Sequence, residues 1–304
     1  MSWHTLTRKP LLILYVAGAV LLLVVGCLWM RHQSTDAKHV FWSTVEQELR
    51  TTGVTVESSQ TANGVSAHQL LQYSFNASSM AHSVTALQQG NTSVTNEMIG
   101  TPTTDYTRYQ RISTDQKKAD GSALNFSQIV GVWAKSDGSI TGPQLFPQTA
   151  LGTSLPLGGV ALPVANLSST ARAQLLDEMR RDSVYQVDYR TVKKTVKDGR
   201  PVYVYAVKIN AVAYAKMMKS FAQAIGLHDL DQLDPARFAQ QQDFSLLLTI
   251  DARAHHMIKA ESVPQGTAPT AAQTYSSYDI PVTITLPSKT ITTDELQKRL
   301  SAAQ

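Results

Sequence analysis

An uncharged apolar run near the amino terminus constrains this chain more than any other feature. Residues 10–30 read PLLILYVAGAVLLLVVGCLWM and contain no charged side chain. At about 1.5 Å per residue, roughly 20 helical residues match the roughly 30 Å thickness of a bilayer's hydrocarbon. The run therefore predicts a transmembrane anchor at 10–31.

The charges around this run predict its orientation. Arg8 and Lys9 precede it, Arg31 follows it, and no acidic residue occurs before Asp36. Positive charge favours the cytoplasmic side, so we expect a cytoplasmic leader at 1–9. The remainder of the chain is then an extracytoplasmic domain, held at the cell membrane by a single pass.

Cys27, the only cysteine of the chain, offers a second interpretation of the same segment. The sequence VVGC at 24–27 resembles the bacterial lipobox, in which a small residue precedes a cysteine that becomes lipidated. Against this interpretation, Leu28, Trp29 and Met30 continue the apolar run, where lipoproteins usually turn small and polar. Lipidation at Cys27 stays open, and both interpretations tether the domain on the same side.

The charge of the remaining chain excludes a nucleic-acid partner. Arg8, Lys9 and Arg31 are three of the 27 basic residues, which leaves 24 basic against 23 acidic residues. A nucleic-acid surface needs an excess of basic residues clustered on one face. With no cysteine outside the anchor, the domain also has no disulfide.

Hydrophobic spacing predicts the order of elements. Phe41, Val45 and Leu49 form one stripe of a short helix, which we place with a linker in a juxtamembrane segment, 32–64. From about 65 to 135, alternating apolar residues and turn sequences such as KKADGS indicate consecutive antiparallel strands. The segment TGPQLFPQTALGTSLPLGGVALP, with four prolines and four glycines, indicates a loop.

Two helices and a tyrosine-rich hairpin are predicted next. Ser168 or Ser169 caps a helix through Arg181, and Asn210 caps another through Ile225. Between them, a three-residue loop Lys197-Asp198-Gly199 would place Tyr189 opposite Val207 and Val187 opposite Ile209. This register gathers the apolar residues on one sheet face: Tyr185, Val187, Tyr189, Tyr203, Tyr205, Val207 and Ile209.

The last part of the chain predicts further strands and a final helix. FSLLLTID and HMIKAESV indicate a strand pair, and TYSSYDIPVTITLP at 274–287 indicates a closing strand. Thr292 and Glu295 have capping-box spacing for a helix at 290–304.

The sequence contains no motif that predicts catalysis, a metal site or a cofactor. Neither a Gly-x-Ser-x-Gly elbow, nor a phosphate-binding glycine loop, nor a His-Glu-x-x-His pair occurs. His255 and His256 are adjacent and on a strand would point to opposite faces. For His68 and His82 we place no partner carboxylate. We therefore predict a non-enzyme without metal or cofactor.

The order of elements from 65 to 289, and most strongly from 184 to 287, resembles the LolA-like carriers and the related LppX/LprG-type lipoproteins. The matching positions of the closing motif are Tyr275, Ser276, Tyr278, Pro281, Val282 and Pro287. The motif departs from the family at Asp279-Ile280, where a glycine is usual before the proline. The resemblance implies an α+β fold in which an antiparallel half β-barrel at 65–289 encloses helices and an apolar cavity.

Binding of a lipid or another hydrophobic ligand is the function that the resemblance implies. Burying acyl chains gains about 0.8 kcal/mol per methylene and needs no catalytic group. The expected cavity residues are Val187, Tyr189, Tyr203, Tyr205, Val207, Ile209, Met218 and Phe221. The alternatives are a tethered interaction or scaffold domain without a small-molecule ligand, and an enzyme whose site is assembled from scattered residues.

Overall fold

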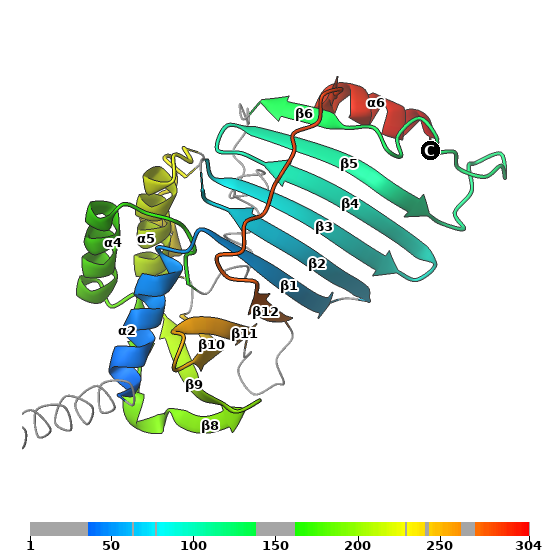
Figure 1. Ribbon diagram of the computed structural model, residues 1–304. Helices are drawn as coiled ribbons and strands as arrows, with labels where there is room; N and C mark the ends of the chain where they lie inside the picture. The colour runs from blue at the N-terminus through cyan, green and yellow to red at the C-terminus, as the bar shows by residue number, and fades with distance from the viewer. Residues whose placement is uncertain are drawn as a thin grey trace, which may run out of the picture.

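A single long sheet dominates the computed structural model of the chain (Figure 1). The structure describes residues 36–62, 64–76, 78–137, 162–228, 230–240, 243–262 and 271–303. The predicted anchor at 10–31 and Cys27 lie outside these residues, and so does most of the predicted proline- and glycine-rich loop. None of the described helices is both long and apolar enough to cross a membrane.

The sheet has thirteen strands in the order β13-β6-β5-β4-β3-β2-β1-β12-β11-β10-β9-β7, and β8 pairs with β9. All pairs are antiparallel except β13 with β6. The strands are β1 (Gly53–Ala62), β2 (Val65–Ser74), β3 (Met80–Gln89), β4 (Thr92–Gly100), β5 (Thr104–Ser113), β6 (Ala134–Asp137), β7 (Tyr185–Val187), β8 (Lys193–Lys197), β9 (Arg200–Ile209), β10 (Phe244–Asp251), β11 (His256–Ser262), β12 (Ala271–Ser276) and β13 (Ile291–Thr292).

The helices divide between the two ends of the sheet (Figure 1). Three of them contact one another near β9–β11, and the fourth packs on β6 and β13. The α-helices are α2 (Ala37–Glu48), α4 (Ser169–Arg181), α5 (Ala211–Ala224) and α6 (Thr293–Ala303), and the 3-10 turns are η1 (Tyr189–Thr191) and η2 (Pro235–Phe238). The α+β class and the large antiparallel sheet expected from the sequence are confirmed.

The predicted helix caps are confirmed in detail. The Ser168 side chain accepts a hydrogen bond from Ala171 N, and the Asn210 side chain accepts one from Ala213 N. The Thr292 hydroxyl accepts one from Glu295 N at 3.2 Å. In each case the side chain satisfies a backbone N–H that the first helical turn leaves without a partner.

Two hydrophobic cores follow from this arrangement. The main core joins α2, α4 and α5 to β1, β2 and β9–β12, and Phe41, Tyr205 and Phe221 in it are fully buried. The small core at the other end joins α6 to β6, with Ile129, Ala134, Leu296 and Ala303 as its buried residues.

Three expectations differ from the structure, two about strands and one about a hairpin turn. The segment 53–62, expected within a linker, forms β1 and pairs with β2 and β12. The closing strand ends at Ser276 instead of continuing to Pro287, because Ser277 and Asp279 adopt positive φ values of 55° and 56°. Asp tolerates this left-handed conformation better than most residues with a side chain.

The tyrosine-rich hairpin has a two-residue turn, so the predicted three-residue loop is wrong. Lys197 pairs with Arg200 across Asp198 and Gly199, both at positive φ, as a type I′ turn requires. The 3-10 turn η1 interrupts the first strand and shifts its phase, so Val187 pairs with Val207 instead of Ile209. Tyr185 and Val187 still lie on the same sheet face as Val207 and Ile209, because the interruption by η1 offsets the change of register that the shorter turn causes.

Candidate functional site

A segment that leaves the sheet and returns to it forms one wall of the candidate site. After β12, residues 277–290, here called the strap, cross the strands as an extended chain and rejoin the sheet at β13 (Figure 1). At its end, Ile291 N donates to Trp133 O at 2.9 Å. No backbone hydrogen bond is described between Thr283–Thr290 and the sheet.

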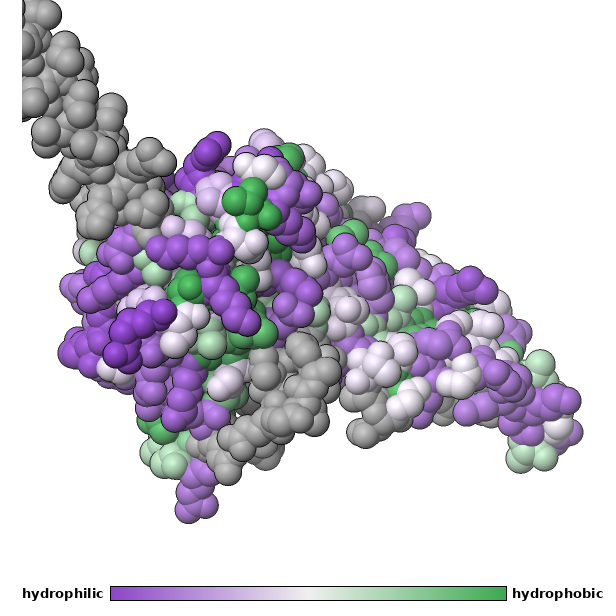
Figure 2. Space-filling view, turned by 90° about the horizontal axis from the view of Figure 1, so that it is seen from below, coloured by the Kyte–Doolittle hydropathy of each residue, from purple (hydrophilic) through white to green (hydrophobic). Residues whose placement is uncertain are grey.

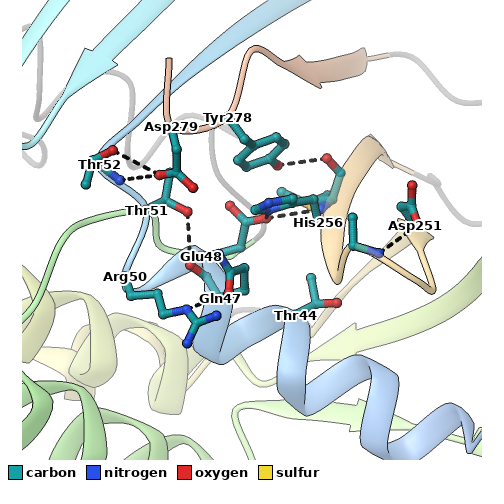
Figure 3. A network of polar contacts seen from close by, with 12 residues as sticks. Thr44, Gln47, Glu48, Arg50, Thr51, Thr52, Asp251, His256, Tyr278 and Asp279 are labelled. Carbon is teal, nitrogen blue, oxygen red and sulfur yellow. Dashed lines mark hydrogen bonds and ion pairs between the residues drawn. The ribbon is translucent and has the colours of Figure 1, made fainter. Parts of the chain in front are cut away.

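The start of the strap is fastened to the corner between α2 and β1 (Figure 3). Asp279 N donates to Gly53 O at 2.8 Å, and the Asp279 carboxylate accepts from Thr52 N at 2.7 Å and from the Thr52 hydroxyl at 3.0 Å. The Tyr278 hydroxyl donates to Met257 O at 2.7 Å. The first residues of the closing motif therefore hold the start of the strap in place.

A buried carboxylate lies behind this fastening (Figure 3). Glu48, fully buried, accepts a hydrogen bond from Met257 N at 3.0 Å, and His256 Nδ1 lies 3.9 Å from the same oxygen. The His256 ring stacks on Tyr278 with centroids 3.9 Å apart. Burial raises the pKa of Tyr278 well above its ordinary value. These residues join α2, β11 and the strap within the protein interior.

Between the strap and the sheet lies a chamber of about 790 Å³. Its sheet side comprises His82 and the β4 and β5 residues Glu97, Ile99 and Arg108. Gly131, Val132 and Trp133 form its end, and the strap side runs from Thr283 to Ile291. This volume falls within the range of small-molecule pockets.

Strand register brings the polar residues of the chamber together on one face. His82 pairs with Ile99, and Glu97 pairs with Arg108 directly across the strands. Ala81 belongs to the main core, so its neighbour His82 points to the opposite face. The chamber therefore lies on the other side of the sheet from the main core.

Glu97 is the centre of a hydrogen-bond cluster in the chamber wall. Its Oε1 pairs with His82 Nε2 at 2.8 Å, while its Oε2 accepts from Arg108 Nε and from Gln110 Nε2, the latter at 2.8 Å. Only 9% of the Glu97 side chain is exposed. Burial alone would raise the pKa of Glu97, but the hydrogen bonds from Gln110, His82 and Arg108 outweigh it and lower this pKa.

Arg108 presents a fixed cation to the chamber. Its guanidinium carbon lies 4.6 Å from the centre of the Trp133 ring, a cation–π contact, and its Nε is bonded to Glu97. Glu97 already accepts from three side chains, so the carboxylate is fully engaged. The contacts described for Arg108 use its Nε and its face, which leaves the terminal nitrogens available for an anionic ligand group.

The residues predicted to line a lipid cavity lie elsewhere, in the main core. Tyr203, Tyr205, Val207, Ile209, Met218 and Phe221 are buried there, and Val187 and Tyr189 pack against it. The Phe41 ring of α2 lies 5.5 Å from that of Tyr205, whose hydroxyl donates to Ala37 O at 3.0 Å. None of the eight lines the chamber.

Sequence reasoning missed most of the chamber. Sequence reasoning assigns no partner carboxylate to His82 or His68, whereas in the structure His82 pairs with Glu97 at 2.8 Å and His68 pairs with Glu57 at 2.9 Å. Within the described residues, no group of three or more His, Cys, Asp or Glu side chains is arranged to hold a metal ion. Knowledge of the strand register would have identified both histidine pairs.

No family model matches this sequence. No curated protein matches it either. Among solved structures, the crystal structure of MucB is similar over 84% of this chain, with 11% identity and a TM-score of 0.32. The complex structure of Pseudomonas aeruginosa MucA/MucB is similar over 86%, with 12% identity and a TM-score of 0.31. The chain spans 61% of the length of each.

Proposed function

We propose that this chain is a membrane-tethered, extracytoplasmic interaction module that binds an extended segment of a partner protein in the chamber, without catalysing a reaction. The observation that carries the proposal is the fixed Arg108 cation on the chamber wall, held between Glu97 and Trp133. The tether is the predicted anchor at 10–31.

The chamber suits a peptide because it combines three kinds of contact. Arg108 and the strap residue Lys289 offer positive charge, while Ile99, Ile284 and Leu286 offer apolar surface. The strap itself is extended, and an extended partner segment can pair its backbone with such a chain. We expect the bound segment to carry an acidic side chain near an apolar one, because the terminal nitrogens of Arg108 and the Lys289 ammonium attract an anion beside the apolar lining.

The lipid-carrier hypothesis receives less support from the same observations. Its eight expected cavity residues pack against one another and against α2 and α5, and they include fully buried Tyr205 and Phe221. Sharing a half-barrel with the LolA-like carriers would not by itself transfer lipid binding.

Peptide display on the purified full-length chain tests the proposal. Selected peptides are synthesised with a fluorophore, and their affinities are measured by anisotropy for the wild type and for Arg108→Ala and Trp133→Ala. We expect acidic peptides whose affinity falls at least about tenfold in both variants. Arg111→Ala, which removes an exposed arginine of the same strand, is the matched control and should leave affinity unchanged.

Two results would contradict the proposal. Selected peptides could bind both chamber variants as tightly as the wild type, which would place the binding surface elsewhere. Native mass spectrometry could instead find co-purified lipid, with uptake of a fluorescent fatty acid by the apo protein. That outcome would favour the lipid-carrier function.

A further inference from the structure

A basic hairpin lies at the end of the molecule where the described chain begins. It comprises residues 193–200, KKTVKDGR, formed by β8, a two-residue turn and the first residue of β9. All five β8 residues are exposed, and Val196 is 69% exposed. In the described sheet, β8 pairs with β9 alone, so its other edge is not covered by a strand.

The hairpin carries a local excess of positive charge. It contains Lys193, Lys194, Lys197 and Arg200 against the single acid Asp198. The whole chain after Arg31 has 24 basic and 23 acidic residues, so outside the hairpin acids slightly outnumber bases. Arg200 lies 3.9 Å from Asp251 but is itself 71% exposed. The hairpin is therefore a local positive patch on a nearly neutral domain.

Contacts place the residues that flank the hairpin beside the start of α2. The 3-10 turn η1 directly precedes β8, and its Tyr189 ring lies 6.2 Å from Phe41 in the second turn of α2. Tyr205 of β9 donates to Ala37 O, the first residue of the helix. Figure 1 shows β8 and the amino-terminal end of α2 at the same lower end of the molecule. Figure 2, seen from below, shows mostly hydrophilic residues with hydrophobic patches between them.

This end of the domain must stay close to the membrane if the predicted anchor is correct. Only 32–35 separate Arg31 from Asp36, and a fully extended chain spans at most about 3.6 Å per residue, so α2 begins within roughly 18 Å of the anchor's end. The long lysine side chains of the edge strand β8 can extend beyond the strand and place their ammonium groups at a nearby charged surface.

We propose that the basic hairpin rests on anionic phospholipid headgroups and so fixes the orientation of the domain on its membrane. The inference rests on the proposed function only through the predicted anchor. A lipid surface fits better than an acidic protein because the patch lies at the membrane-proximal end. Electrostatic attraction draws the lysines to the headgroups, and Val196, exposed between them, enters the interface.

Fluorescence of the full-length chain in vesicles tests this contact. An environment-sensitive fluorophore is attached at Val196→Cys in a Cys27→Ser background, and the protein is reconstituted into phosphatidylcholine vesicles with or without phosphatidylglycerol. We expect a blue shift only with phosphatidylglycerol, reversed by high salt. Replacing Lys193, Lys194 and Lys197 by Gln should abolish the shift. The same fluorophore at Asn91→Cys, in the distant β3–β4 turn, should not respond.

The outcomes separate the contact from the anchor. Vesicle flotation in pure phosphatidylcholine reports the anchor, and a chain that fails to float there overturns the anchor and this inference together. A chain that floats, but whose Val196 fluorophore gives the same emission in both lipids, overturns the contact alone. The same holds if the shift persists in the triple Gln variant, because the lysines would then serve only to protect an exposed sheet edge from aggregation.

Discussion

Glu97 is a nearly buried carboxylate on the sheet face that lines the chamber. Three donors, from His82, Arg108 and Gln110, converge on its two oxygens. A buried charge is tolerated only when it is paired and hydrogen-bonded in this way. The cluster orients Arg108, so the positive charge offered to a ligand depends on Glu97.

Replacing Glu97 by Gln tests this dependence. The new amide NH2 would face donors, so we expect the free energy of unfolding to fall by about 1–3 kcal/mol, the cost of leaving a buried donor without an acceptor. Urea unfolding measures the change. The matched control is Glu57→Gln, which alters an exposed histidine pair whose side chains are 55% and 60% exposed. It should change stability by less than about 0.5 kcal/mol, and equal losses in both variants would contradict the expectation.

The lowered pKa of Glu97 gives this stability difference a pH dependence. Burial would raise the pKa, but the hydrogen bonds prevail, so the folded value lies below the ordinary 4.5. Stability from such a group is present above the unfolded pKa and is lost as pH falls through the folded pKa. We expect the gap between wild type and Glu97→Gln to be constant above about pH 5.5 and to shrink below pH 4.5. A gap that widened with acid would contradict the assignment.

What the sequence could reveal at this scale depended on local signals. Helix-capping side chains were predicted because a cap and its partner N–H lie within three residues. The carboxylate partner of His82 is Glu97 of β4, fifteen residues away. The register between the strands decides whether the two side chains meet. A one-residue slip would place Glu97 on the opposite face, and nothing in the local pattern fixes that choice. Residue pairs of this kind therefore needed the structure.

At the scale of elements, the strap is the feature that creates the chamber, and its start depends on Asp279. Asp279→Ala removes the acceptor for Thr52 N and for the Thr52 hydroxyl, and places alanine at a φ of 56°. We expect a loss of about 1–2 kcal/mol in unfolding free energy and faster hydrogen exchange at Thr52 N–H.

Asp279→Asn is the control for this prediction, because it retains the side-chain oxygen and asparagine tolerates positive φ. It should keep most of the stability and the slow exchange at Thr52. If the Ala and Asn variants behaved alike, the carboxylate would contribute nothing specific to the start of the strap.

The strap and the hairpin also show where element prediction fails. Both departures occur at residues with positive φ, which are Ser277 and Asp279 in the strap and Asp198 in the hairpin turn. Alternation of apolar residues continues past Ser276 in the sequence, so the pattern alone favours a longer strand. Non-glycine residues in the left-handed region end or turn a strand without a compositional signal.

At the scale of the whole molecule, the α+β class was predictable because apolar periodicity changes between strands and helices along the chain. The division into two cores was not predictable. The small core contains residues from 129–134 and from 296–303, which the sequence separates by more than 150 positions. Its assembly depends on the strap, which carries the chain from β12 to the far edge of the sheet.

The two cores differ greatly in size, so we expect them to open separately. Leu296, 7% exposed, is one of only four buried residues in the described small core. Leu296→Ala should remove about 2–3 kcal/mol of local stability and speed exchange at Ile291 N–H, which bonds to Trp133 O, and in α6. Amides of the β9–β10 pair should keep their wild-type rates under native conditions.

Leu248→Ala is the converse change, because Leu248 is fully buried in the main core. It should speed exchange throughout the domain, since loss of the main core unfolds the sheet that the small core needs. If Leu296→Ala accelerated β9–β10 amides as much as those of α6, the domain would open as one unit. The strap would then stay in place as the wall of the chamber under native conditions. Local opening at α6, in contrast, would free the end of the strap and give an extended ligand a route into the chamber.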